Sequence, residues 1–447
     1  MSTYIKKFQT HNDYMTSSLV YPNVSLCMDN TNEDFIDVHY NPIHNYAEEY
    51  LTFVALEDGI FTFSPQNNNV ISYSIDNGET WTTGNGINVS AGDEVLWKGE
   101  MIPNNMGIGN FTSTAEFNVK GNIMSLLYGD NYKGQTSLTN YDSEFYNLFD
   151  RNTKLINAKN LSLPATTLTD SCYSNMFYSC TALTTAPELP ATTLASNCYS
   201  NMFEGCRSLM TAPELPATTL AYGCYEYMFY SCTSLITTSE LPATTLASYC
   251  YGNMFQGCTS LVSAPELPAT TLASSCYQYM FYDCTVLATA PELPATTLAI
   301  GCYYGMFNGC TALVTAPELP ATTLATSCYR YMFNCCTALV TAPELPATTL
   351  TEYCYQSMFQ GCTSLVSAPE LPATTLVNNC YKNMFDACTL LNYIKAMFTT
   401  TPSSTYTGHW VRGVASTGTF VKNSAATWTT TGNNGVPSGW TVQTTSA

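Results

Sequence analysis

The sequence predicts an α+β solenoid, a stack of short repeated units with a small β-rich region at each end. The first observation behind this prediction is that the pair Leu-Pro recurs nine times at an unbroken spacing of 26 residues, from Leu163 to Leu371. The second is that every unit contains Leu-Pro-Ala-Thr-Thr-Leu followed by Cys-Tyr-x-x-Met-Phe-x-x-Cys. Units of this length cannot bury an apolar face alone, so they stack on their neighbours and form a rod with a long surface.

Each unit is predicted to contain one short strand and one short helix, as in a leucine-rich-repeat array. The segment Leu183–Leu189 is expected to carry the strand, and Pro187 limits its length. The helix is predicted from an apolar stripe at i, i+4 and i+8. The stripe consists of Leu194, Cys198, Met202 and Cys206.

Two regions are expected before the array. Residues 1–45 are polar, and alternation in Val24–Cys27 and Phe35–Tyr40 predicts a small hairpin. We interpret this region as an anchoring arm that a partner orders. Residues 46–119 contain short strand-like segments separated by turn sequences, which predicts a small β-sandwich.

The array itself has predicted ends. Residues 120–162 form a degenerate capping repeat, in which Phe145–Phe149 echoes the Tyr-x-x-Met-Phe block. Residues 163–391 are the nine-unit solenoid. Residues 392–447 begin as a half-unit and then become rich in turn glycines, which predicts a β-rich cap over the exposed core.

Charge and hydropathy exclude several classes of function. The chain of 447 residues has 14 basic and 33 acidic residues and a net charge of −19, which disfavours nucleic-acid and anionic-membrane binding. No run of 18 apolar residues predicts a membrane span. The N-terminal residues contain no apolar signal-peptide core. A display rod without an export signal suggests release by lysis, as part of a virus particle.

The 20 cysteines resemble a disulfide scaffold in number but not in spacing. Eighteen occupy two fixed positions in each unit, eight residues apart, which is roughly 12 Å along a helix and too far to bridge. Between units they stack in columns of nine, which cannot pair off evenly. We interpret them as buried thiols. Zinc is disfavoured because the chain has no Cys-x-x-Cys pair.

The Leu-x-x-Ala-Pro-Glu-Leu-Pro, Met-Phe-x-x-Cys and Cys-Thr-x-Leu elements resemble the BspA-type leucine-rich repeats, which are common in surface proteins of gut Bacteroidales and their phages. The resemblance covers residues 163–391. The order of PNVS…VHYNP, FVALEDGIFTFS…YSIDNGETW, repeats and SGWTV also resembles tail- or head-fibre proteins of gut phages. The resemblance implies adhesion and host interaction and implies no enzymatic role.

One segment matches a known short motif. Residues 74–81, SIDNGETW, fit the S-x-D-x-G-x-T-W Asp-box pattern, of which sialidases carry several copies. A single copy is a hairpin device, in which Asp and Gly make the turn and Trp packs beneath it. Sialidase activity is therefore disfavoured, and a glycan-active enzyme remains the least supported class.

An acidic residue recurs once per unit and predicts a ladder of like charges roughly 5 Å apart. We interpret this ladder as a solvated face, with a cation-binding strip or a docking stripe for a basic partner as the alternative. Calcium would need more oxygen ligands than one glutamate column supplies. The acidic ladder consists of Glu188, Glu214, Glu240, Glu266, Glu292, Glu318, Glu344 and Glu370.

Tyrosines occur in two settings. The column from Tyr173 to Tyr381 is invariant among the units, which favours packing. Other tyrosines stand at positions that differ between units, among Ser, Asn and Gly, as in adaptable binding loops. Exposed drift on a helix face is the alternative. The candidate binding surface consists of Tyr222, Tyr227, Tyr249, Tyr279, Tyr304, Tyr331 and Tyr353.

No nucleophile and base stand together, and we expect no catalytic residues, cofactor or metal. The sequence therefore predicts a non-enzymatic virion fibre or decoration protein of a bacteriophage, located on the capsid or tail exterior. Residues 1–45 would attach to other virion proteins, and the solenoid would bind a host cell-surface glycan or protein. A homo-oligomer, specifically a trimer, is implied by resemblance only. A bacterial cell-surface adhesin is the alternative.

Overall fold

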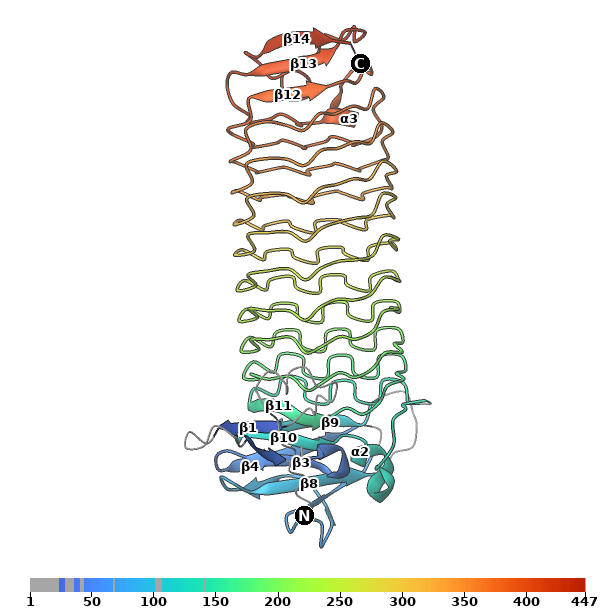
Figure 1. The fold of residues 1–447 in the computed structure, drawn as a ribbon, viewed down its shortest axis with the longest axis vertical. Coiled ribbons are helices and arrows are strands. Elements are labelled where there is room, and N and C mark those ends of the chain that lie inside the picture. Colours follow the sequence, from blue (N-terminus) through green and yellow to red (C-terminus); the bar gives the residue numbers. More distant parts are fainter. Residues whose placement is uncertain are drawn as a thin grey trace.

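The computed structural model describes residues 24–28, 36–40, 44–66, 69–100, 107–139 and 141–446. These residues form an elongated stack with a β-rich region at the N-terminal end, a long series of repeated coils, and a small sheet at the C-terminal end (Figure 1). Each coil lies on the next along the long axis. The chain therefore has the solenoid architecture that the 26-residue period predicts.

The predicted N-terminal hairpin is present. Strand β1 (Val24–Met28) pairs antiparallel with β2 (Ile36–Tyr40), with Val24 opposite Tyr40. The rest of the segment before residue 44 lies outside the described residues. Its role as an anchoring arm stays a prediction.

The next region contains two β-sheets whose aromatic side chains meet. The larger sheet has the order β11-β10-β3-β8-β5-β6, and the smaller has the order β7-β4-β9. Phe53 of the larger sheet contacts Phe61 and Phe111 of the smaller sheet, with ring centroids 5.5 and 4.8 Å apart. The elements are η1 (Tyr46–Glu48), β3 (Leu51–Ala55), β4 (Gly59–Pro65), β5 (Ile71–Ser74), β6 (Thr82–Thr83), β7 (Ile87–Val89), β8 (Glu94–Gly99), β9 (Gly109–Ser113), β10 (Phe117–Asn122), α2 (Ser125–Tyr128), η2 (Gly129–Asn131) and β11 (Leu155–Ser162).

The larger sheet continues directly into the solenoid. Strand β10 pairs antiparallel with β3 on one side and parallel with β11 on the other. Strand β11 in turn bridges the first repeat unit, with Asn157 opposite Thr185. The backbone hydrogen bonding therefore has no break at residue 119, where the sequence suggested a domain boundary.

The segment before the first unit forms an additional coil. Phe145 stacks on Tyr173 at 5.5 Å, and Phe149 stacks on Phe177 at 5.4 Å, with ring planes within 8° of parallel. Asn152 is 3% exposed and donates through Nδ2 to the carbonyl oxygen of Phe111 at 3.0 Å. This coil joins the β-sheets to the regular array.

The prediction of one helix per unit is wrong. The segment from residue 170 to 180 and its equivalents, which we name the turn segment, forms consecutive turns and contains no helix in any of the nine units. Successive N–H groups alternate between two kinds of acceptor. The N–H of Met176 bonds the carbonyl oxygen of Tyr173 three residues back, whereas that of Phe177 bonds Met202 in the next coil at 2.9 Å. A helix would keep all of these bonds within the segment.

The period of the apolar residues explains the error. Cys-Tyr, Met-Phe and Cys recur at a spacing of four residues, so a helix of 3.6 residues per turn would rotate them away from one face. The structure uses a four-residue cycle, in which every fourth residue has a positive φ near 55°, as in Ser171, Asn175 and Ser179. These positions carry many Ser, Asn and Gly residues, a signal for left-handed backbone rather than for a helix.

The predicted strand of each unit is reduced to single bridges. Thr211 bridges Thr237, and Thr315 bridges both Thr289 and Thr341, always at 26 residues. A second column of bridges joins residues such as Thr297 and Thr323. The proline in the segment prevents a longer ladder because it has no N–H to donate.

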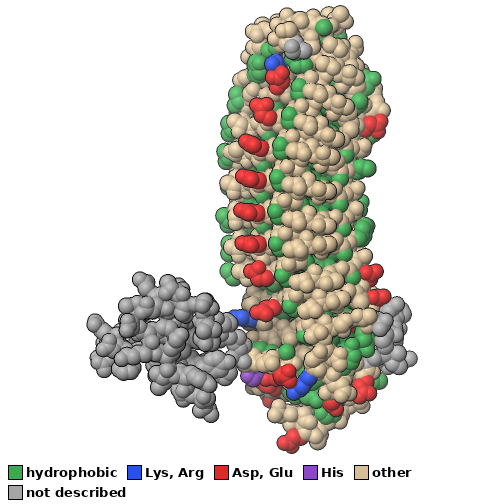
Figure 2. Space-filling model, turned by 45° about the vertical axis from the view of Figure 1, so that its right-hand side comes forward, with side chains coloured by type: hydrophobic (Ala, Val, Ile, Leu, Met, Phe, Trp, Pro, Cys, Tyr) green, Lys and Arg blue, Asp and Glu red, His purple; other side chains and the backbone are tan. Residues whose placement is uncertain are grey.

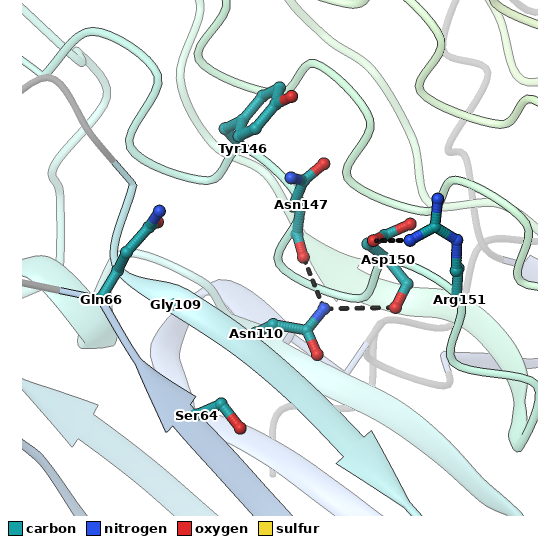
Figure 3. Close-up of a pocket in the computed structure, with 8 residues that line it drawn as sticks. All are labelled: Ser64, Gln66, Gly109, Asn110, Tyr146, Asn147, Asp150 and Arg151. Atoms are coloured by element: carbon teal, nitrogen blue, oxygen red, sulfur yellow. Dashed lines mark hydrogen bonds and ion pairs between the residues drawn. The ribbon is translucent and has the colours of Figure 1, made fainter.

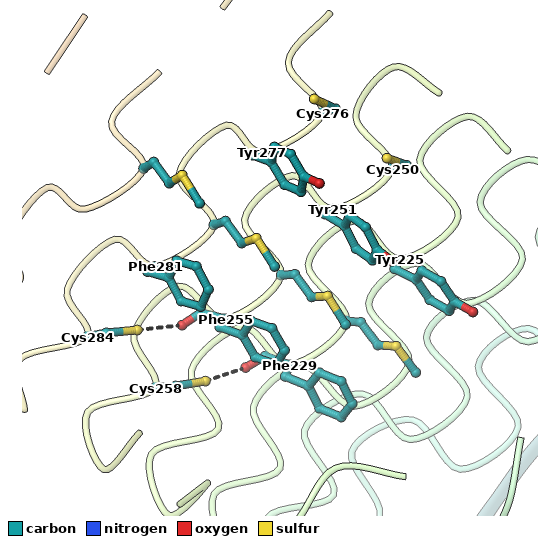
Figure 4. Close-up of a cluster of buried hydrophobic side chains, with 14 of the residues drawn as sticks. Tyr225, Phe229, Cys250, Tyr251, Phe255, Cys258, Cys276, Tyr277, Phe281 and Cys284 are labelled. Atoms are coloured by element: carbon teal, nitrogen blue, oxygen red, sulfur yellow. Dashed lines mark hydrogen bonds between the residues drawn. The ribbon is translucent and has the colours of Figure 1, made fainter. Parts of the chain in front are cut away.

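The core consists of columns of identical side chains (Figure 4). Tyrosine rings such as Tyr225 and Tyr251 stack at 5.8 Å, and phenylalanine rings such as Phe229 and Phe255 stack at 5.6 Å. The tyrosines of the column from Tyr173 to Tyr381 are at most 1% exposed. The interpretation of this column as packing is confirmed by its burial.

The second cysteine of each unit has a specific role. The Cys258 thiol donates to the carbonyl oxygen of Phe229 in the preceding coil at 3.1 Å, and the equivalent bond is present in all nine units. The thiol thereby gives the buried phenylalanine carbonyl oxygen a hydrogen-bond donor. The cysteines from Cys172 to Cys388 carry free thiols, and the two cysteines that recur in each unit are buried, which confirms their interpretation as buried thiols. Cys335, which lies outside these two positions, is exposed.

The C-terminal region continues the stack. Strands β12 (Tyr393–Ala396), β13 (Thr419–Asn423) and β14 (Thr441–Thr445) form a parallel sheet, and the chain passes through α3 (Ser404–Thr407) on its way from β12 to β13. Ser367 bridges Tyr393, so β12 extends the bridge column of the repeats. Tryptophans at 410, 428 and 440 are at most 7% exposed. They fill the core of this region, as the stacked tyrosine and phenylalanine rings do in the repeats.

Candidate binding face

The turn segment presents one face of the solenoid. Within each four-residue cycle two neighbouring side chains are buried in the core, and the next two lie on the outer side of the coil, where their exposure ranges from 0% at Ser357 to 50% at Tyr222. In the first unit the inward pairs begin at Cys172 and Met176, which are 0% exposed. We name the outward residues the turn face, which in the first unit comprises residues 170, 171, 174, 175, 178 and 179.

Differences between the units concentrate on this face. The inward Cys-Tyr, Met-Phe and Cys residues are the same in all nine units, and so is the Leu-Pro-Ala-Thr-Thr-Leu segment. The outward position after the first Cys-Tyr, in contrast, is Ser, Ser, Glu, Gly, Gln, Tyr, Arg, Gln and Lys along the array. The core and the frame are therefore repetitive, whereas the turn face has an individual surface.

The seven candidate tyrosines all lie on the turn face. Tyr222 is 50% exposed, and the other six are partly buried. Five of them occupy left-handed positions with φ between 51° and 61°, where a bulky residue is strained. These five are Tyr227, Tyr249, Tyr279, Tyr331 and Tyr353.

The structure divides the candidates into groups. Tyr222 contacts Tyr249 edge-on, with centroids 5.7 Å apart. Tyr304 contacts Tyr279 at 5.0 Å and Tyr331 at 5.7 Å. Tyr279, Tyr304 and Tyr331 therefore gather around one stretch of the face, and Tyr353 joins them through Arg330. Tyr227 lies two coils before Tyr279.

Arg330 lies at the centre of the larger group, a role that sequence reasoning missed. Its guanidinium carbon is 5.5, 5.1 and 5.2 Å from the ring centroids of Tyr304, Tyr331 and Tyr353. In the described part of the chain no carboxylate pairs with it, and its Nε is buried without a hydrogen-bond partner. Contact with ring faces leaves the in-plane N–H groups of the two terminal nitrogens available to a ligand.

Tyr230 and Tyr282 were also missed. Tyr230 contacts Tyr227 edge-on at 5.8 Å, and Tyr282 contacts Tyr279 in the same way at 5.5 Å. Each pair is formed by an outward residue and the one three positions later. The signal in the sequence is a recurrence at 52 residues, which is two units.

Sterics supports this two-coil period. Outward side chains at left-handed positions lean toward the following coil, so a large residue requires a small one after it. A Cβ added to Gly305 would clash with the ring of Tyr279, one coil earlier in the same column. Likewise, Gly309 follows Asp283 and Gly257 follows Ser231.

Half-buried carboxylates lie near the first tyrosine pair. Burial raises the pKa of Glu226 to about 6, and burial also raises the pKa of Glu204, whose side chain accepts a hydrogen bond from Asn201. Both residues adjoin Tyr227, whose own pKa is raised by burial and then by these charges. Together with Arg330, they supply hydrogen-bonding groups beside aromatic rings.

The acidic ladder lies on a different part of the surface. All eight glutamates are exposed, and Figure 2 shows acidic side chains in a column along the solenoid. Lys395 of β12 pairs with Glu370 at 2.8 Å at the end of the ladder. In the described residues no group of three or more His, Cys, Asp or Glu side chains could hold a metal ion. The exposure of the ladder agrees with a solvated face.

The Asp-box forms a turn between β5 and β6. The Ser74 hydroxyl bonds Asp76 at 2.6 Å and accepts from the N–H of Gly78 at 2.9 Å. Bonds from Ser74 and Thr80 hold the pKa of Asp76 at about 2. Trp81 packs edge-on against Tyr50 at 5.0 Å. The motif acts here as the hairpin device that was expected.

A cavity of about 340 Å³ lies between β4, β9 and the first coil (Figure 3). The side-chain amide of Asn110 donates to the carbonyl oxygens of Asn147 at 2.8 Å and Asp150 at 3.2 Å. These bonds attach the coil to the sheet. Asp150 is paired with Arg151 at 3.4 Å. The cavity is therefore part of the junction between the sheets and the solenoid.

The stacked coils, single bridges and repeated leucines define a leucine-rich-repeat protein. A family model described as the BspA type leucine rich repeat region matches residues 148–287 and 274–408, in six copies. The matches cover more than half of the chain, which belongs to this family. BspA-type repeats are typical of surface-exposed, adhesin-like proteins. Comparison with curated proteins gives no match.

Within the described ranges, no helix is long and apolar enough to cross a bilayer.

Proposed function

We propose that this chain is a non-enzymatic adhesion protein on the exterior of a bacteriophage particle and that its turn face contacts the host surface. The observation that supports the adhesive role is the distribution of differences between units. Residues that pack the core or shape the frame are constant, whereas the turn face differs from coil to coil. Selection for stability alone gives no reason for aromatic side chains at strained outward positions.

The virion location rests on the order of regions along the chain. A short N-terminal arm, a β-rich module, a long solenoid and a closing segment resemble phage fibre proteins in this order. In this proposal residues 1–45 attach to the particle, and the solenoid extends away from it. The turn face is then presented along the full length of the rod.

The second candidate is a bacterial cell-surface adhesin. The family match favours it, because BspA-type repeats are typical of surface proteins. In this alternative the turn face has the same adhesive role, but the protein is displayed on a bacterial cell and not on a phage particle.

Self-association is proposed from a second surface stripe. One position per unit, directly before the Thr or Ser of the bridge column, carries an exposed apolar side chain in six units. These residues are between 39% and 56% exposed and form a column parallel to the solenoid axis. They are Met210, Ile236, Val262, Val314, Val340 and Val366. A continuous apolar stripe of this kind is suited to packing against a second copy of the chain.

Immunogold labelling tests the location. Antiserum against residues 163–391 is applied to purified phage particles and to uninfected host cells. The proposal predicts label on particles, at the capsid or the tail. Label on uninfected cells alone would contradict the virion location and support the bacterial adhesin.

A further inference from the structure

We propose that the turn face binds a neutral linear polysaccharide that lies parallel to the solenoid axis, with sugar rings stacked on the outward tyrosines. The inference rests on the proposed adhesive function and names its ligand class. Tyr227, Tyr279 and Tyr331 stand in one column at intervals of 52 residues. They form a row of aromatic rings on a straight line.

The spacing of the row suits a polymer. Adjacent coils are joined by parallel backbone bridges, for which the usual separation is about 4.8 Å. Two coils therefore advance about 10 Å by the separation of the bridges, and about 12 Å by the 5.8 Å spacing of tyrosine rings in adjacent coils, which is on the scale of one disaccharide in an extended chain. A ligand with a regular repeat can then place equivalent sugars on successive tyrosines. Several weak contacts on one chain add up to strong binding.

The tyrosines at these positions are not explained by the fold. The ring of Tyr279 leans over Gly305 in the following coil, where a larger side chain would clash with it. Such contact requires a small residue after the ring, but it does not require tyrosine at the first position. Asn occupies the same column at Asn175, Asn201 and Asn253 and is suited to a left-handed backbone. Strain retained at an outward position indicates a role for the ring.

Side chains beside the tyrosine row can contact the faces and the hydroxyl groups of sugar rings. Tyr230 and Tyr282 stand edge-on to Tyr227 and Tyr279, so each pair offers ring surface in two orientations. Glu226 and Arg330 adjoin the row and can accept from and donate to hydroxyl groups. Sugar sites combine such polar groups with aromatic faces.

Charge selects a neutral ligand. Residues 163–388 contain 14 acidic and 3 basic residues, a net charge of −11. A polyanionic chain along this solenoid would be repelled over its whole length. A neutral polymer has no such penalty, and the carboxylates then serve as hydrogen-bond acceptors.

Affinity electrophoresis of the full chain tests the proposal. The gels contain β-1,3-glucan, β-1,4-glucan, α-1,4-glucan, β-1,4-mannan or β-1,4-xylan. We expect retardation by at least one polymer and at least a tenfold loss of affinity in the triple variant Y227N/Y279N/Y331N. Asn stands naturally in this column, so the variant keeps the fold. The control E266Q/E292Q/E318Q changes three exposed residues on the other face and should bind unchanged.

Two results would overturn the ligand class. One is migration unaffected by every polymer, and the other is retardation that the triple tyrosine variant retains. Binding of the labelled chain to host cells before and after periodate oxidation separates this failure from failure of the adhesive function. Binding that survives periodate leaves adhesion in place and excludes a glycan, whereas absence of cell binding removes the proposed function itself.

Discussion

Left-handed residues hold the turn segment in its shape. Three such positions occur in each unit, with φ between 51° and 77° in all nine. Ser, Asn, Asp and Gly tolerate this conformation, and bulky residues do not. The pattern of small polar residues was visible in the sequence. The four-residue apolar period is close to that of a helix, so the sequence alone places these residues on a helix face, either as adaptable binding positions or as exposed drift.

Cys335 tests the strain at one of these positions. It has a φ of 57°, and the equivalent residues one coil before and after it are Gly309 and Gly361. We expect Cys335→Gly to raise the free energy of unfolding by about 1 kcal/mol, because glycine has no Cβ to clash. Cys335→Val should lower it, since a β-branched residue is poorly suited to this backbone. Urea denaturation followed by tyrosine fluorescence measures both changes. A valine variant with the same free energy of unfolding as the parent chain would contradict a left-handed backbone at residue 335.

Glu144 gives the chain a pH-dependent element. It is 0% exposed, and burial raises its pKa from 4.5 to about 7. Between these values the folded state binds more protons than the unfolded state. Its contribution to stability is therefore full below pH 4.5 and is lost as the pH rises through 7.

Glu144→Gln should remove this dependence. At pH 8 the variant should be more stable than the parent chain by on the order of 2 kcal/mol, and at pH 4 the two should be similar. Thermal melts at both pH values measure the difference, with the exposed Glu266→Gln as control. An equal effect of Glu144→Gln at both pH values would exclude titration of this carboxyl.

At the scale of elements, the coils depend on hydrogen bonds between units rather than within them. The number and length of the units follow from the sequence, because the motif recurs without a slip. The helix in each unit was wrong, because an apolar stripe at i, i+4 and i+8 also fits a turn segment. Arg330 among its tyrosines was not predictable, since the contacts join three different units.

Circular dichroism distinguishes the two structures of the unit. In the described part of the chain, α2 and α3 are the only α-helices, and each has four residues. We expect a far-ultraviolet spectrum without the paired helical minima near 208 and 222 nm. A spectrum with those minima, as nine helices would produce, would contradict the turn segment.

At the scale of the whole molecule, one rod carries three parallel stripes. The turn face takes several residues from every unit, the acidic ladder takes one residue from each of eight units, and the apolar stripe from Met210 to Val366 takes one from each of six units. A period of 26 residues therefore fixes the frame, while unit-specific residues are added on one side. The N-terminal sheets and the C-terminal coils close the two ends of the core, as an array with a continuous core requires.

The apolar stripe predicts self-association. Thr184 occupies the stripe position in the first unit, so threonine is compatible with the frame. The variant I236T/V262T/V314T/V340T should shift the chain from an oligomer to a monomer. Analytical ultracentrifugation measures the change, with E266Q/E292Q/E318Q as the control. A parent chain that is already monomeric at micromolar concentration would contradict the proposal.

The central claim is that the turn face is the adhesive surface. The most direct measurement is binding of the fluorescently labelled full chain to host cells by flow cytometry. The parent chain is compared with a variant in which Tyr227, Tyr279, Arg330, Tyr331 and Tyr353 are replaced by Asn or Ser, the residues that other units carry in the same columns. The account predicts at least a tenfold loss of binding with an unchanged thermal melt, and undiminished binding by the ladder control. Full binding by the turn-face variant would contradict it.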